Sequence, residues 1–177
     1  MKQIAIAGLV LAFTANSLVA ASRVMGQTYS FMVPDHVIFE SHQDMEFYTF
    51  RWGKAPHVAL FMLNANPAPL TVRALKPMAD MMAVTFEDQI KKQIALSDIQ
   101  TERTELQIGP FEGIQIAFTM KQTSGDIMLQ YMLILHDGDR AWNAQLTANT
   151  TNDILTAHAI MQTAEKIAKQ PENSNKE

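Results

Sequence analysis

The sequence predicts an α+β fold in which an antiparallel β-sheet of about six to seven strands is packed by two long α-helices, as an α/β/α sandwich. Three observations predict it. Segments that alternate apolar and polar residues follow one another with short turns between them, which is typical of antiparallel strands. Two other stretches show the helical spacing of apolar residues. The order along the chain is strands, helix, strands, helix.

The centre of the predicted sheet is the stretch 127–149, which reads as two long strands joined by a tight turn at residues 136–139. Its first arm is almost continuously apolar, and this indicates a strand that is covered on both faces. Its second arm alternates, with Trp142, Ala144 and Leu146 on one side. Only one face of that arm is therefore apolar.

Residues 1–21 have the layout of a cleavable secretory signal peptide. Lys2 gives a positive start, residues 4–13 form an apolar run, and Ala20 and Ala21 are the small residues that signal peptidase requires. The apolar run is too short for a permanent membrane span. We expect cleavage after Ala21, which leaves one α+β domain over residues 22–170 and a flexible tail at residues 171–177.

Composition excludes several classes of protein. At 177 residues the chain can form one domain with a substantial core. Its net charge is −4 and its basic residues are scattered, which argues against nucleic-acid binding. The absence of cysteine excludes thiol catalysis and thiolate metal sites. Export without disulfides favours the periplasm of a Gram-negative bacterium over eukaryotic secretion.

The segment before the first helix has strand character throughout. Pro34 ends the first strand because it cannot donate to a β-ladder. Tyr48, Phe50 and Trp52 lie on one side of an alternating run, and a turn at residues 53–56 makes this run the first arm of a hairpin. The strands predicted here cover residues 27–33, 37–40, 45–52 and 57–64.

The first helix is predicted to begin at Pro77, because a proline in the first turn loses no hydrogen bond. On the side away from the apolar stripe, Glu87–Lys91 and Asp88–Lys92 form i,i+4 pairs in the favourable orientation. The stripe itself recurs every four residues, and Met81 is placed on the same face; its members are Met78, Met82, Phe86, Ile90 and Ile94.

Strands are predicted at residues 98–108 and 114–121, with turns at residues 109–113 and 124–126. After the central stretch, residues 150–153 provide hydroxyl groups and an acid that cap a helix start. The second helix is predicted to reach about Lys169. Its stripe consists of Ile154, Ala157, Met161, Ala164 and Ala168.

Two short motifs and the closing helix carry a resemblance to a known fold. The first motif is Tyr29–Pro34, YSFMVP, an opening strand that ends in proline, and the second is the hairpin 135–143, LHDGDRAWN. Both are similar to the PsbP-like fold of the photosystem II P subunit, the Mog-type Ran-binding proteins and the bacterial DcrB-like envelope proteins. The resemblance implies a binding, assembly or accessory role. It selects none of these roles, and the signal peptide does not suit a cytoplasmic Ran partner.

The histidines and the central turn are candidates for a metal or catalytic site. The histidines, at positions 36, 42, 57, 136 and 158, lack the spacing of metal ligands. His136 lies beside Asp137 and Asp139, whose carboxylates suit a cation. A tight turn requires the same residue types, and we interpret the group as a turn, with Arg140 paired to one of these acids at the surface.

Methionines and glutamates offer two further candidates. The chain has 12 methionines, and Met78, Met81 and Met82 have thioether groups that suit Cu(I). We interpret them as core residues of the helix stripe. Glycoside hydrolysis requires a pair of carboxylates, which the sequence cannot place at a defined separation. Four glutamates could supply such a pair, and we interpret them as solvated side chains; these are Glu46, Glu102, Glu105 and Glu112.

The sequence therefore predicts a non-catalytic exported protein that binds a partner protein as an accessory, chaperone-like or immunity-type factor. No catalytic, cofactor-binding or metal-binding residue is assigned, and no cofactor is expected. We expect no nucleic-acid partner and no stable membrane anchor after signal cleavage. A periplasmic carrier of a small ligand or of Cu(I) is the alternative, and a hydrolase built from scattered histidine and aspartate residues is a third hypothesis.

Overall fold

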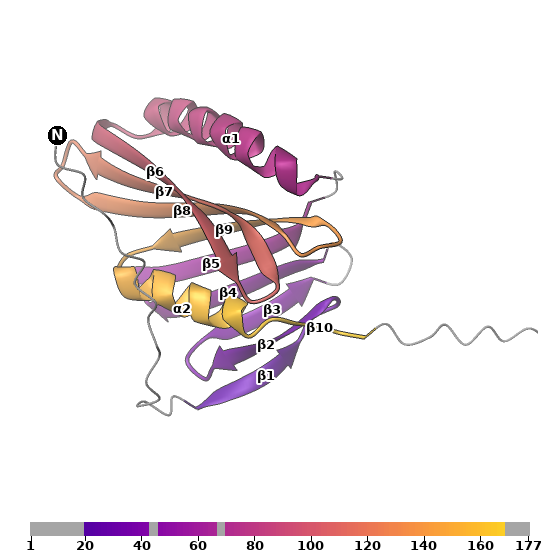
Figure 1. Ribbon diagram of the computed structural model, residues 1–177. Helices are drawn as coiled ribbons and strands as arrows, with labels where there is room; N and C mark the ends of the chain where they lie inside the picture. The colour runs from indigo at the N-terminus through magenta and orange to yellow at the C-terminus, as the bar shows by residue number, and fades with distance from the viewer. Residues whose placement is uncertain (1–19, 43–45, 67–69, 169–177) are drawn as a thin grey trace, which may run out of the picture.

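The computed structural model describes residues 20–42, 46–66 and 70–168 (Figure 1). Its main element is a seven-stranded antiparallel sheet, which confirms the α+β class. No helix in these ranges is long and apolar enough to cross a membrane. The strands, in their order across the sheet, are β3 (Ile38–His42), β4 (Phe47–Lys54), β5 (His57–Ala65), β9 (Ala141–Ala148), β8 (Ile127–His136), β7 (Phe111–Gln122) and β6 (Leu96–Ile108).

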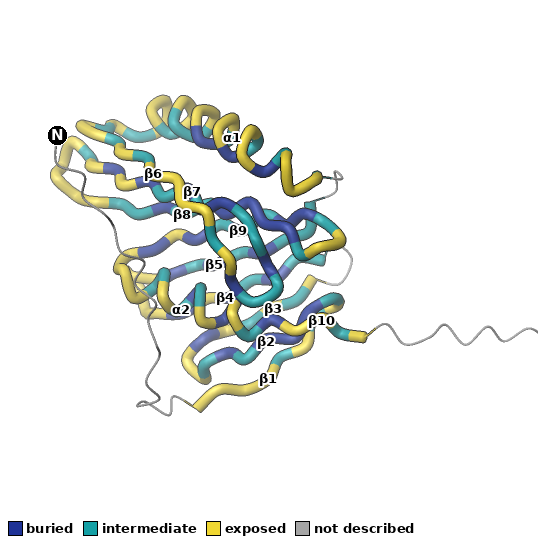
Figure 2. The backbone as a smooth tube through the Cα atoms, in the orientation of Figure 1, coloured by how far each residue is buried: buried dark blue, intermediate teal, exposed yellow. Residues whose placement is uncertain are grey.

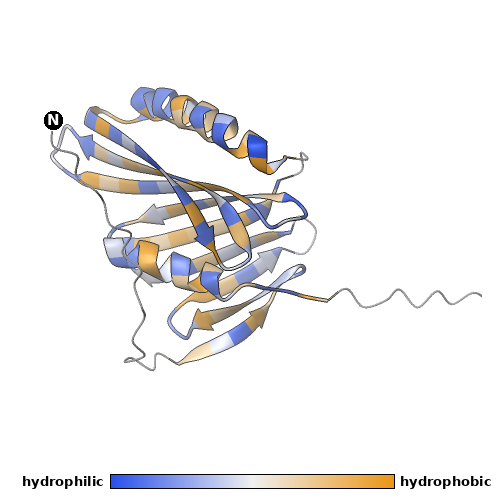
Figure 3. Cartoon of the chain, in the orientation of Figure 1, coloured by the Kyte–Doolittle hydropathy of each residue, from blue (hydrophilic) through white to orange (hydrophobic). Residues whose placement is uncertain are grey.

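The central hairpin of the prediction is confirmed as β8 and β9. Leu133, Ile134 and Leu135 are consecutive and all buried, so β8 is covered on both faces at this end. On β9, Trp142 and Leu146 are buried and Thr147 is exposed. The alternation of polar and apolar residues along the strands can be followed in Figure 3. The pattern arises because successive side chains of a strand point to opposite faces.

A second, three-stranded sheet consists of β1 (Ala21–Met25), β2 (Tyr29–Pro34) and β10 (Glu165–Lys166). Only β2 was predicted, and it ends at Pro34 as expected. β1 runs antiparallel to β2 and is largely exposed. β10 pairs on the other side of β2 with only two residues. This small sheet forms a further layer that the predicted α/β/α arrangement does not contain.

Helix α1 spans Val72–Gln93, so the prediction that it begins at Pro77 is wrong. The helix starts more than a turn earlier and contains Pro77 in its interior, where a proline removes one backbone hydrogen bond. Leu75 and Ala79, on either side of the proline, are buried against β7 and β8. Burial of this first part of α1 offsets the cost of the interior proline.

Helix α2 spans Thr151–Gln162 and is shorter than predicted. Its start is confirmed, because the Asp153 carboxylate accepts a hydrogen bond from the Thr150 N–H at 2.9 Å. Its predicted end near Lys169 is wrong. The Thr163 hydroxyl accepts the Met32 N–H of β2 at 2.9 Å, and the chain then continues as β10. Pairing with β2 therefore replaces two further turns of helix.

The two helices pack on opposite faces of the large sheet. Ile134 of β8 lies in one hydrophobic cluster with α1, whereas its neighbours Leu133 and Leu135 lie in another with α2 and β2. Figures 1 and 2 show α1 alone beyond one face, and α2 with the small sheet beyond the other. The larger cluster is rich in aromatic residues: Tyr29, Phe31, Tyr48, Phe50, Trp52, Phe61, Phe111 and Trp142.

Candidate functional site

The carboxylate of Asp137, in the β8–β9 turn, is a buried hydrogen-bond acceptor. Its side chain is 1% exposed. Its Oδ2 accepts the Tyr29 hydroxyl at 2.5 Å and the Trp142 indole N–H at 2.9 Å. Its Oδ1 accepts the backbone N–H groups of Asp139 at 2.9 Å and Arg140 at 3.0 Å. The carboxylate thus connects the turn to the aromatic core and to β2.

These hydrogen bonds determine the ionisation of Asp137. Burial alone would raise the pKa of the carboxyl group, but the donors from Tyr29, Trp142 and the turn backbone outweigh it and hold the pKa well below 3.8. For the hydroxyl of Tyr29, burial and the neighbouring carboxylate both raise the pKa. Asp137 is therefore held in its charged form, and its hydrogen bonds anchor the turn to β2 and to the aromatic core.

The guanidinium of Arg140 forms its ion pair with Glu46 and not with an acid of its own turn, so the predicted surface pair is wrong. Its guanidinium forms a two-pronged ion pair with Glu46, in which Nη2 donates to Oε1 at 2.7 Å and Nη1 donates to Oε2. Nη2 also donates to the Thr28 hydroxyl at 2.9 Å, and the group lies 4.7 Å from the Trp142 ring centre. The hydrogen bonds with Glu46 raise the pKa of Arg140. The pair links segments that are distant in the sequence.

A cavity of about 470 Å³ opens beside this network. Lys166, which lines the cavity, forms salt bridges with two carboxylates: its Nζ lies 2.7 Å from Asp139 and 3.5 Å from Asp137. Arg140 and Asp137 are engaged as described above. Its lining residues are Gln27, Thr28, Glu46, Asp137, Asp139, Arg140, Lys166 and Ile167. The cavity is therefore polar, and its named charges stabilise one another.

The histidines do not come together. His136 is 8% exposed, and its Nδ1 accepts the Gly138 N–H at 3.0 Å within the turn. His158 of α2 lies 2.9 Å from Gln115, and burial lowers its pKa. His42 stacks on the Phe47 ring. Within the described ranges, no three His, Asp or Glu side chains gather in a way that could hold a metal ion.

The methionines of α1 divide between two environments. Met78 and Met82 are partly buried against the cluster under α1, as the stripe predicts. Met81 is 58% exposed, so its placement on the same face is wrong. The helix rotates by about 100° per residue, which turns Met81 away from the sheet. The three thioethers therefore do not form one Cu(I) site.

Two of the four candidate glutamates lie close together. Glu105 of β6 is opposite Ile114, and Glu112 of β7 is opposite Gln107. Because Ile114 packs under α1, Glu105 and Glu112 both lie on the face of the hairpin that α1 covers. Glu102 lies on the other face, because its position differs from that of Glu105 by three and side chains alternate between the two faces of a strand. Glu46 belongs to the Arg140 network described above.

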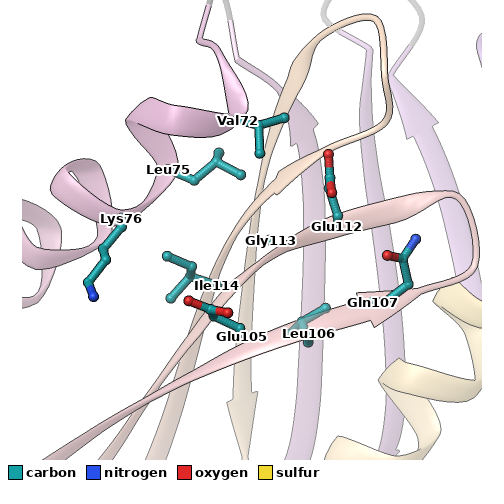
Figure 4. Close-up of a pocket in the computed structure, with 9 residues that line it drawn as sticks. All are labelled: Val72, Leu75, Lys76, Glu105, Leu106, Gln107, Glu112, Gly113 and Ile114. Atoms are coloured by element: carbon teal, nitrogen blue, oxygen red, sulfur yellow. The ribbon is translucent and has the colours of Figure 1, made fainter.

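Glu105 and Glu112 line a groove between α1 and the β6–β7 hairpin (Figure 4). The groove consists of a cavity of about 420 Å³ and one of about 120 Å³, which share Lys76, Glu105 and Ile114. The residues of the larger cavity are Val72, Leu75, Lys76, Glu105, Leu106, Gln107, Glu112, Gly113 and Ile114. The smaller one adds Ala79, Asp80, Arg103 and Thr104. Sequence reasoning missed the groove, because it requires the packing of α1 on the hairpin.

The face of the sheet that α1 covers continues beyond α1. This helix packs on β6, β7 and β8. In the antiparallel register, Gln130 of β8 lies opposite Thr147 of β9, and Thr147 lies opposite Leu60 of β5. Leu60 in turn lies opposite Arg51 of β4. Side chains opposite one another share a face, so the α1 face extends over β9, β5, β4 and β3.

We call the part of this face that the described helices leave uncovered the open face. Val58 and Ile38 are 39% and 52% exposed, although both are apolar. Buried Gln130 Nε2 and Asn143 Oδ1 lie on the same side of the sheet, and neither has a hydrogen-bond partner in the described chain. The apolar residues of the open face are Ile38, Phe47, Val58, Leu60 and Met62.

Comparison with known proteins gives no family assignment. No family model matches the chain, and no curated protein matches its sequence. A crystal structure from Bacteroides thetaiotaomicron VPI-5482 is similar, with a TM-score of 0.52 and 12% sequence identity. The match covers 80% of this chain but 46% of that one, so this chain spans about half the length of the similar structure. The likeness concerns the fold alone.

A second solved structure is a protein of unknown function from Pseudomonas aeruginosa. It has a TM-score of 0.39 and 16% identity, over 76% of this chain and 86% of that chain.

Proposed function

We propose that the chain is a non-catalytic exported protein that binds a partner protein, as an accessory, chaperone-like or immunity-type factor of the periplasm. The observation that carries this proposal is the open face. Apolar side chains on a sheet are normally covered by a packed layer. Here one helix covers three strands of the face, and Val58 and Ile38 remain exposed beside it.

The dimensions of the open face suit a protein contact. β5 has nine residues, and a strand of this length extends for about 30 Å. Four neighbouring strands span about 14 Å across, so the face measures roughly 400 Å². Standard interfaces bury about 800 Å² per partner, with an apolar centre and a polar rim. The open face has the size of such a centre, and exposed Arg51 and Glu40 lie within it among the apolar side chains.

The proposal also includes export by a cleaved signal peptide and a PsbP-like fold for the mature domain. The expected signal peptide, residues 1–21, lies almost entirely outside the described residues. Cleavage after Ala21 would remove the first residue of β1 and leave the other four, from Ser22 to Met25, at the start of the mature chain. The domain of residues 22–170 and the tail 171–177 follow. The PsbP-like resemblance supports a binding or accessory role for this domain, since the members of that fold mostly serve such roles.

Site-specific photocrosslinking in the protein's own cells tests the proposal. A benzophenone side chain at Val58 is expected to produce one discrete adduct with a second polypeptide, because it lies on the open face. The matched control is Val84, an exposed valine on α1 at 58% exposure, which should give none. Leu60→Glu, combined with the Val58 label, should remove most of the adduct, since burial of a charge against an apolar partner is unfavourable.

Three results would contradict partner binding at the open face. One is the absence of any adduct from Val58, another is equal labelling from Val84, and the third is an adduct that contains only this chain. N-terminal sequencing of the recovered protein checks the export step separately, with Ser22 expected as the first residue.

A small-ligand carrier is the second candidate function, and the groove beside α1 favours it. A cavity of about 420 Å³ is within the usual range for a small-molecule site. An organic ligand suits the groove better than Cu(I), because Met81 lies on a different side of α1 from Met78 and Met82.

A further inference from the structure

The groove between α1 and the β6–β7 hairpin has an apolar floor that is held by regular secondary structure. Leu75 of α1 is 3% exposed and Ile114 of β7 is 7% exposed. Ala79, at the narrow end, is fully buried. Because helix and hairpin are packed together here, the floor is preformed rather than assembled by a ligand. It can receive a small aliphatic group.

Positive and negative side chains lie on opposite sides of this apolar floor. Lys76 comes from α1, whereas Glu105 and Glu112 come from the hairpin (Figure 4). At the narrow end Arg103 and Asp80 form an ion pair of 2.9 Å and neutralise each other. No salt bridge within the described ranges involves Lys76, Glu105 or Glu112. The groove thus offers one cation and two carboxylates to a ligand.

We propose that this groove binds a small zwitterion with an aliphatic body, of the chemical class of an amino acid or a short peptide. The ligand's carboxylate pairs with the Lys76 ammonium, and its ammonium group pairs with the carboxylates of Glu105 and Glu112. The aliphatic body covers Leu75 and Ile114. A purely cationic ligand would be repelled by Lys76, and a purely anionic one by the two glutamates. This site is separate from the open face.

Titration of the folded, ¹⁵N-labelled protein with four probes tests the proposal. The probes are L-leucine, the tripeptide Ala-Leu-Ala, N-acetyl-leucine, which lacks the ammonium group, and leucine amide, which lacks the carboxylate. Saturable shifts are expected at the amides of Leu75, Glu105 and Ile114 with the two zwitterions. Each blocked probe should bind about tenfold more weakly, because it loses one charged hydrogen-bonding group. Tighter binding of either zwitterion shows whether the free amino acid or the peptide is the preferred source.

Charge-removing variants separate the two ends of the ligand. Lys76→Gln should weaken the binding of L-leucine and N-acetyl-leucine but not that of leucine amide, which loses a repulsion and should bind at least as tightly. Glu105→Gln should weaken the binding of L-leucine and leucine amide but not that of N-acetyl-leucine, which loses a repulsion and should bind at least as tightly. Glu102→Gln is the matched control on the same strand, because Glu102 lies on the opposite face. Dispersed spectra confirm that each variant is folded.

The proposal is overturned if none of the probes gives saturable shifts at concentrations up to about 10 mM, tenfold above a dissociation constant of 1 mM. It is also overturned if the shifts lie outside the groove, or if Glu102→Gln weakens binding as much as Glu105→Gln does.

Discussion

Replacement of Asp137 by alanine is expected to destabilise the protein by about 3–5 kcal/mol, because it removes the acceptor of several buried donors. The hydroxyl of Tyr29 and the indole N–H of Trp142 would both lose their partner, and both residues are fully buried. Two backbone N–H groups of the turn would lose theirs as well. Asp137→Asn, which keeps an acceptor oxygen but removes the charge, should cost less.

Urea unfolding monitored by tryptophan fluorescence measures these differences, since Trp142 itself reports on the site. Asp139→Ala is the matched control in the same turn. Its side chain is 81% exposed and its partner is a surface lysine, so the expected loss is below about 1 kcal/mol. Equal effects of the two alanine variants would show that the buried hydrogen bonds of Asp137 do not stabilise the fold.

The same contacts predict how stability depends on pH. In the folded protein the pKa of Asp137 lies below 3.8, its ordinary value in an unfolded chain. The unfolded state therefore binds the proton first as the pH falls. The contribution of Asp137 is fully present above about pH 5 and is lost progressively as the pH falls through 4 and below. The difference in unfolding free energy between Asp137→Asn and the wild type should therefore shrink in acid.

Strands were predictable where one face of the sheet is buried and the other is not. Ile114, Ile116 and Phe118 alternate with more polar residues, and all three are buried under α1. With such a pattern, a shift of the strand by one residue would turn all the apolar side chains toward water, so the pattern determines which face is buried. β1 and β10 lack this signal, because β1 is exposed and β10 has two residues.

Errors arose where a distant contact overrode a local preference. The sequence after Gln162 has helical periodicity, but pairing of Lys166 with Tyr29 draws it into the small sheet. Arg140 has acids beside it in the turn, yet it pairs with Glu46, which lies 94 residues earlier. A local charge pattern cannot identify such a partner, because the fold decides which side chains meet.

A correct prediction of the β6–β7 turn would have indicated one wall of the groove. The sequence places a turn over residues 109–113, whereas β7 already begins at Phe111. With the shorter turn, the antiparallel register puts Glu112 opposite Gln107 and Glu105 opposite Ile114. Both glutamates then fall on one face of the hairpin. The position of α1 over that face still depends on packing, which the sequence alone does not disclose.

Substitution of Gly113 is the other change with a large expected effect. A Cβ atom at this position would lie 2.1 Å from the carbonyl oxygen of Ile134 and 2.9 Å from the Cα of Leu135. Both atoms belong to the backbone of β8, so no side-chain rotation can relieve the clash. Gly113→Ala is therefore expected to cost about 3 kcal/mol or more, through separation of β7 from β8.

Gly125→Ala is the control that separates this clash from the loss of glycine's conformational freedom. Gly125 has a φ of +98°, and a Cβ atom there would have no neighbour within 4 Å. Alanine at Gly125 should therefore cost only backbone strain, about 1–2 kcal/mol. Denaturant unfolding of both variants gives the comparison. A loss at Gly113 no larger than that at Gly125 would mean that β8 moves aside easily. A larger loss would show that close approach of the two strands fixes the hairpin wall that carries Glu112.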